Sequence, residues 1–204
     1  MSDKLNVIRQ TVATLDRSVI TYLGQRAMYS FDLDNYEPGW FFGFYMELVS
    51  ADEAQNILDY FLPSAEAKYT TYTLPLICAE GLPHRPDVIQ MDCNAMWAIM
   101  LRMRTSVRVA LTKYSQGIGG LREAVNACDA TAIRDCITIP SVEETVLDRI
   151  LKTATDFVHK NATPANPLLH FPDAVALIYK EWIIPMSCSV QVRWLFHQYG
   201  IKEE

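Results

Sequence analysis

Two cationic residues on one apolar helix are the strongest chemical feature of the sequence. The stretch from Asp92 to Tyr114 lacks Pro and Gly and is rich in Met, Leu, Ala and Arg, which predicts one long helix. Arg102 and Lys113 lie eleven positions apart on it, about three turns at ~3.6 residues per turn, so both point to the same side. Because that side is otherwise largely apolar, burying two cations there requires an anionic partner. The helix therefore predicts a site for an anion.

Composition limits the classes of partner. The chain has 204 residues, half of them hydrophobic, and a formal net charge of −6. This negative charge argues against nucleic acid as a partner, because a protein that binds phosphates needs a basic face. The sequence contains no run of about eighteen apolar residues, so we expect no membrane-spanning helix. The first ten residues lack the apolar core of a signal peptide, which favours a cytoplasmic protein, but a secreted protein whose signal has been removed would look the same.

Cysteine and histidine usage predicts neither a metal site nor a disulfide framework. The cysteines are odd in number, dispersed and without a CxxC pair, which is typical of free thiols in a reducing compartment. The four histidines are dispersed as well, with no paired spacing. We therefore expect a protein that needs no metal and no cofactor.

Helical periodicity recurs along the chain, and no strand pattern of any weight appears. We expect helices over residues 4–29, 44–61, 92–114, 120–128, 129–137, 141–160 and 173–198, the last interrupted at Pro185. Four prolines between residues 62 and 86 predict an extended linker, with a short strand at Tyr69–Thr73 as the alternative. The predicted fold class is all-α, with long helices and a shortened irregular middle segment.

Further polar residues sit beside the apolar faces of these helices. Arg9 lies next to the apolar stripe of the first helix, although a surface arginine with a packed stem would look the same. Ser141 and Glu144 match a capping box, which places Glu143 in the first helical turn, where any acid complements the helix dipole. Ser187 and Gln191 share one helix face at i, i+4, and a polar surface turn is the alternative.

Three stretches carry a resemblance to a known family. They are NVIRQTVATLDRSVITYLGQRAMY near the N-terminus, SVEETVLDRILKTA after residue 140, and FPDAVALIYKEWIIPMSCSVQVRWLFHQYG near the C-terminus. Together they resemble the eukaryotic, all-helical chorismate mutases. The resemblance implies a single domain over residues 1–204, a multi-helix bundle and a homodimer.

The resemblance also assigns roles to the residues already picked out. It implies that Arg9 and Arg102 bind the two carboxylates of chorismate and that Ser187 lies near one of them. It implies further that Lys113 and Gln191 face the ether oxygen, and that Glu143 binds the ring hydroxyl. Ile139 stands where some members have a hydrogen-bonding Asn or Asp, which implies weaker recognition of the ring hydroxyl or recognition through the backbone.

The implied activity is the rearrangement of chorismate to prephenate in the shikimate pathway, which supplies Phe and Tyr. Chorismate is a dianion, and the implied set of three cations and one carboxylate leaves two positive charges to match it. Regulated members have a Gly-Ser pair where this chain has Pro86-Asp87, so we expect no control by Trp or Tyr. Two alternatives remain open: a relative that acts on another pericyclic substrate, and a secreted effector with the same fold.

Overall fold

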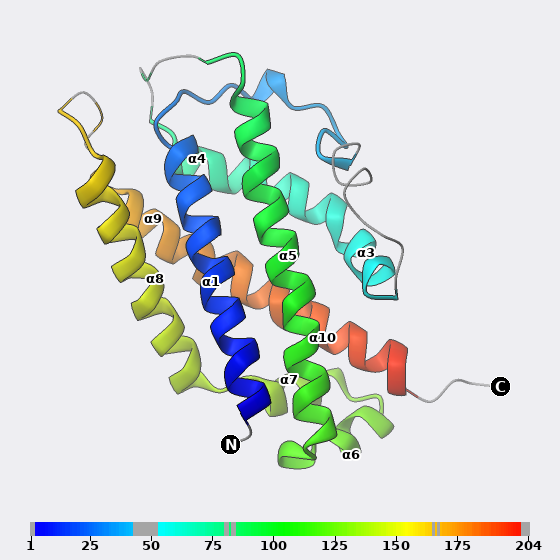
Figure 1. Ribbon diagram of the computed structural model, residues 1–204. Coiled ribbons are helices and arrows are strands. Elements are labelled where there is room, and N and C mark those ends of the chain that lie inside the picture. The colour runs from blue at the N-terminus through cyan, green and yellow to red at the C-terminus, as the bar shows by residue number, and fades with distance from the viewer. Residues whose placement is uncertain are drawn as a thin grey trace.

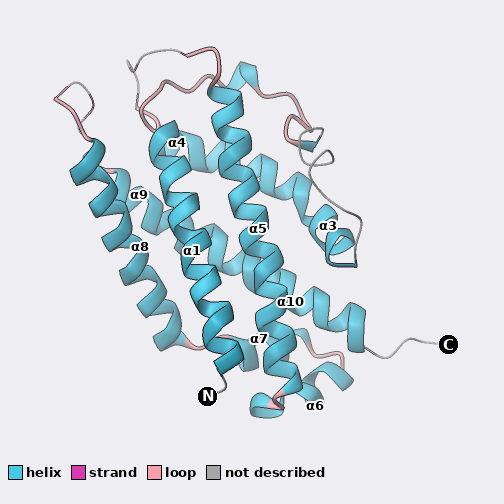
Figure 2. Cartoon of the chain, viewed as in Figure 1, coloured by secondary structure: helices cyan, strands magenta, loops and turns pink. Residues whose placement is uncertain are grey.

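The computed structural model describes residues 3–42, 53–79, 82, 85–164, 166 and 168–200, and this part of the chain is mostly helical (Figures 1 and 2). Within these ranges no strand forms beyond an isolated bridge between Thr163 and Asn166. The predicted all-α class is therefore confirmed. The α-helices are α1 (Asp3–Arg26), α3 (Glu53–Lys68), α4 (Leu74–Ile77), α5 (Val88–Ser115), α6 (Leu121–Asn126), α7 (Ala130–Ile137), α8 (Pro140–Asn161), α9 (Phe171–Ile178) and α10 (Ile184–Tyr199).

Helices α1 and α5 run antiparallel, side by side, through the middle of the molecule (Figure 1). Their facing apolar residues join those of the other long helices in one core, where Leu23, Ile99 and Ile178 are fully buried. The unbroken helix predicted from residue 92 in fact begins earlier, at Val88. None of the helices in the described ranges combines the length and the apolar character needed to cross a membrane.

Two buried ion pairs join α1 to α5. Each helix carries an aspartate and, ten positions later, an arginine: Asp16 and Arg26 in α1, Asp92 and Arg102 in α5. Because the helices are antiparallel, Arg26 Nε lies 3.0 Å from Asp92 Oδ1, and Arg102 Nε lies 2.6 Å from Asp16 Oδ1. Buried pairs of this kind add little net stability, but an unpaired member would be costly, so they fix the register of the two helices.

The segment between residues 62 and 86, which we expected to be an extended linker, is helical over most of its length, so that prediction is wrong. Helix α3 continues through Pro63 and passes by a π-helical turn, Tyr69–Thr73, into α4. In that turn the N–H of Leu74 donates to the carbonyl of Tyr69, five residues earlier, so Pro75 can follow without ending the helix. Tyr69 is fully buried, and tertiary packing of this kind overrides the tendency of proline to break helices. Of the helix expected over 44–61, residues 44–52 lie outside the described part.

The C-terminal helix repeats this arrangement and confirms the expected interruption. A second π-helical turn, Tyr179–Ile183, joins α9 to α10 immediately before Pro185. The N–H of Ile184 donates to the carbonyl of Tyr179, again five residues back. The hydroxyl of Tyr69 donates to Asp92 Oδ1 at 2.7 Å, and that of Tyr179 to the backbone carbonyl of Asp16 at 3.4 Å. Each π-turn thus brings a buried tyrosine to one of the two ion pairs.

The start of α8 differs from the expected capping box. The helix begins at Pro140, and the preceding Ile139 occupies the cap position without a side-chain hydrogen bond. Ser141 therefore already lies inside the first turn, and its carbonyl accepts from Thr145. Proline suits the first helical position because its missing N–H would have had no helical partner. Glu143 remains in the first turn, as expected.

Removing one member of the Arg26–Asp92 pair should destabilise the fold. In Asp92→Asn the guanidinium of Arg26, whose side chain is fully buried, loses its counter-charge, so the free energy of unfolding should fall by about 3–5 kcal/mol. Urea unfolding measures the change. The control is Asp87→Asn, whose partner Arg85 is 44% exposed, and which should unfold like the parent chain. Equal losses in the two variants would contradict a register role for the buried pair.

Candidate active site

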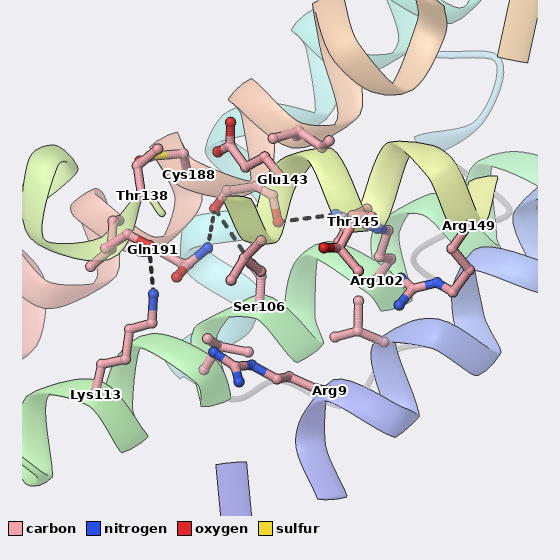
Figure 3. Close-up of a pocket in the computed structure, with 17 residues that line it drawn as sticks. Arg9, Arg102, Ser106, Lys113, Thr138, Glu143, Thr145, Arg149, Cys188 and Gln191 are labelled. Atoms are coloured by element: carbon pink, nitrogen blue, oxygen red, sulfur yellow. Dashed lines mark hydrogen bonds between the residues drawn. The ribbon is translucent and has the colours of Figure 1, made fainter. Parts of the chain in front are cut away.

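A cavity of about 350 Å³ is lined by residues of α1, α5, α8 and α10 and by residues at the junction of α7 and α8 (Figure 3). Its walls are mainly apolar, with polar groups projecting inward from several helices. The predicted site residues that line it are Arg9, Arg102, Lys113, Glu143, Ser187 and Gln191. Residues separated by up to 182 positions in the sequence therefore meet around one space.

Arg102 is held from behind by a buried carboxylate. Its side chain is 6% exposed; Nε donates to Asp16 Oδ1 at 2.6 Å, and Nη1 donates to Ser187 Oγ at 3.1 Å. The second oxygen of Asp16 accepts from Arg149 Nη2 at 2.7 Å. Burial lowers the pKa of Arg102, but Asp16, with a further contribution from Tyr179, outweighs this effect, so the net change is upward and the guanidinium stays charged. Asp16 thereby fixes two arginines at the cavity wall.

Lys113 lies at the other end of the cavity, as its position three turns from Arg102 predicted. It is 6% exposed, and Nζ donates to the carbonyl of Ile137 at 2.5 Å. Burial, and after it the charge of Arg9, lower the pKa of Lys113, while Cys188 and Glu143 partly oppose this change. An ammonium with three donors retains hydrogen-bonding capacity for a ligand.

The formal charges around the cavity leave a positive surplus. The cationic side chains that line it are Arg9, Arg102, Lys113 and Arg149. Glu143 supplies one negative charge to the wall, and Asp16, behind Arg102, supplies a second. Two surplus positive charges therefore face a small pocket, which suits a compact dianion.

Gln191 and Ser187 occupy one face of α10, as their spacing predicted. Gln191 Nε2 donates to the backbone carbonyl of Ser187 at 3.2 Å, which leaves its second N–H available. Its Oε1 is buried and has no hydrogen-bond partner in the described part of the chain. Buried polar atoms are normally paired, so an orphan atom beside a cavity indicates a place for a ligand or water.

Ile139 is the predicted site residue that does not line the cavity. The residue is 38% exposed and is absent from the cavity lining, and the preceding Thr138 lines the wall instead. Sequence reasoning also missed Asp16 and Arg149. Asp16 lies seven positions after Arg9, which is two turns along the same face of α1, so helical spacing could have identified it. Within the described ranges, no three His, Cys, Asp or Glu side chains gather to hold a metal ion.

Comparison with known proteins points to one group of enzymes. No protein-family model matches the chain. Chorismate mutase 1 of Petunia hybrida is 32% identical over 114 residues, which cover 52% of this chain and 35% of the relative. The matches to curated chorismate mutases span between 35% and 52% of those relatives' lengths.

Solved structures of chorismate mutases can be superposed on nearly the whole chain. The Aro7p chorismate mutase of Candida albicans, in complex with L-Trp, has a TM-score of 0.71 at 17% identity, covering 94% of this chain and 90% of that one. The structure of AtCM1 with tyrosine bound in its allosteric site has a TM-score of 0.70 at 18% identity, covering 97% of each chain. The chain therefore has the fold of the eukaryotic chorismate mutases, as its sequence led us to expect.

The affinity of the cavity for a small dianion should depend on the titration of Lys113. Because the pKa of Lys113 is below the usual 10.5, its ammonium is lost at a lower pH than that of an exposed lysine. The Kd of a cyclic dicarboxylate, measured by calorimetry between about pH 7 and pH 10, should rise as pH increases through this pKa. Lys113→Met should bind weakly at every pH without that slope. A slope of equal size in both chains would assign the titration to another group.

Proposed function

We propose that this chain is a chorismate mutase, which converts chorismate to prephenate in the pathway to Phe and Tyr. The observation that carries the proposal is the cavity with two surplus positive charges, lined by residues at the positions that the family resemblance implies. Chorismate carries two carboxylates and must fold into a compact chair before its bonds rearrange. A small pocket with positioned cations favours that conformer over the extended one.

The two carboxylates would be bound by arginines. Arg102 is preorganised by Asp16, and its planar fork suits a carboxylate better than a lysine would. Arg9 projects into the same space from α1 (Figure 3). Ser187, which already accepts from Arg102, lies where it can donate to the carboxylate bound there. These contacts hold the ends of the substrate so that the reacting carbons approach each other.

Bond breaking would be assisted at the ether oxygen. In the rearrangement the C–O bond breaks as a C–C bond forms within the same molecule, and negative charge grows on the ether oxygen. Lys113 and Gln191 would donate to that oxygen, because both line the cavity and both retain N–H groups. Donors that are positioned before the reaction stabilise the transition state without reorganisation. Gln191 is neutral at every pH, so its contribution does not titrate.

We also propose that the activity is not controlled by Trp or Tyr. The support is the Pro86-Asp87 pair, which replaces the Gly-Ser pair of regulated members, at the start of α5. Asp87 is engaged there by Arg85, whose Nε lies 2.6 Å from Asp87 Oδ1. The solved relatives bound to L-Trp and to tyrosine make this a departure from their behaviour. Chorismate consumption should therefore be the same with and without either amino acid, and inhibition by either would refute the proposal.

Assembly and location are part of the same proposal. The resemblance implies a homodimer. The five cysteines are all free thiols, which fits the cytoplasm or another reducing compartment better than secretion. The position of Ile139 outside the cavity favours a second candidate, a related mutase whose substrate differs from chorismate at the end that Glu143 faces.

The direct test is an assay of chorismate absorbance with the parent chain and Arg102→Ala side by side. The parent should consume chorismate, and the variant should lose about 10²- to 10³-fold in kcat/KM because a preorganised electrostatic contact is gone. Arg102→Lys keeps the charge that Asp16 needs, so it controls for loss of folding. Binding of chorismate by the parent without turnover would favour the second candidate.

A further inference from the structure

The short junction between α7 and α8 decides which side chain reaches the cavity. Only Thr138 and Ile139 separate the two helices, and both are extended, with φ, ψ of −92°, 127° and −126°, 105°. Pro140 enforces this at Ile139, because the residue before a proline is driven out of the helical region. In an extended segment successive side chains point to opposite sides. Ile139 faces solvent, so Thr138 faces inward.

Lys113 secures this arrangement from inside the site. Its ammonium donates to the carbonyl of Ile137, the residue immediately before Thr138. Ile137 itself is 7% exposed and packs in a second apolar cluster with Val192 and Leu195 of α10. The position of Thr138 is therefore fixed on one side by a cation of the site and on the other by the core.

The hydroxyl of Thr138 is available to a ligand. It lies 3.7 Å from Cys188 Sγ, a long contact with a weak partner. The Thr138 side chain lines the cavity beside Cys188, and the next helical turn carries Glu143, whose N–H donates to the carbonyl of Ile139 (Figure 3). A hydroxyl donor and a carboxylate acceptor are thus presented on the same wall of the space.

We propose that Thr138 is a substrate-positioning residue that donates a hydrogen bond to the ring hydroxyl of the substrate, while Glu143 accepts one from it. This inference rests on the proposed function. A hydroxyl group has one hydrogen to donate and lone pairs that accept, and an ionised carboxylate can satisfy only the former. Thr138 supplies the missing donor. Thr138 would therefore bind the hydroxyl in place of the residue at position 139, where some family members have Asn or Asp. The isoleucine at position 139 would then not abolish recognition of the hydroxyl.

The test compares Thr138→Val, which removes the hydroxyl and keeps the shape, with Thr138→Ser, which keeps the hydroxyl. Thr138→Val should raise KM for chorismate by about three- to tenfold, the scale of one neutral hydrogen bond, with kcat nearly unchanged, because the contact is equal in ground and transition states. Thr138→Ser should retain a KM near that of the parent. The control Ile139→Val trims the neighbouring side chain outside the cavity and should leave both constants unchanged. A parent-like KM in Thr138→Val would overturn the assignment.

A substrate analogue separates recognition from packing. With an analogue of chorismate whose ring hydroxyl is replaced by hydrogen, the parent and Thr138→Val should have equal inhibition constants against chorismate turnover. A persistent difference would show that Thr138 acts through packing and would also overturn the inference. If the parent chain consumes no chorismate at all, the proposed function fails. If the parent is active and the Thr138 variants behave alike, the positioning role alone fails.

Discussion

The buried carboxylate of Asp16 is the interaction on which the site depends. It accepts from Arg102 on α5 and from Arg149 on α8, so one side chain of α1 fixes three helices around the cavity. Without it, the buried guanidinium of Arg102 would lose its counter-charge and would face the positive charge of Arg149. Because Asp16 cancels only one of their charges, a positive charge remains at the cavity wall. The same contact therefore stabilises the helix arrangement and leaves charge for a ligand.

The two ends of the α1–α5 pair differ in how completely their charges are satisfied. Around Arg26 the guanidinium contacts Asp92, Tyr36 and the thiol of Cys78, and burial raises the pKa of that thiol to about 12. This end is closed and nearly neutral. Around Arg102 the neighbouring side chains leave an open space with surplus charge. A similar Asp–Arg arrangement thus lies in a closed core at one end and beside the candidate site at the other.

The sequence predicted the helices and most of the residues that line the cavity better than it predicted the connections. Helical spacing places Arg102 and Lys113 on one face of α5, and Ser187 and Gln191 on one face of α10. The family resemblance was needed to single out the second pair, because spacing alone also fits a polar surface turn. Helix α4 and the π-turn before it were missed because Pro63 and Pro75 are local signals, whereas the burial of Tyr69 that keeps the chain helical depends on distant residues. Thr138 was missed because the φ and ψ angles of a two-residue junction decide which side chain faces inward.

The π-helical turn Tyr179–Ile183 limits which insertions and deletions this segment of the chain can tolerate. A π-turn accommodates one residue more than an α-helical turn, and one residue corresponds to about 100° of rotation around a helix. Ser187 and Gln191 lie directly downstream on α10, so their orientation depends on that additional residue. Deleting a single residue here would rotate both side chains to a different direction, and it would also remove the turn that accommodates Pro185. Substitutions in this segment can be tolerated where an insertion or deletion cannot.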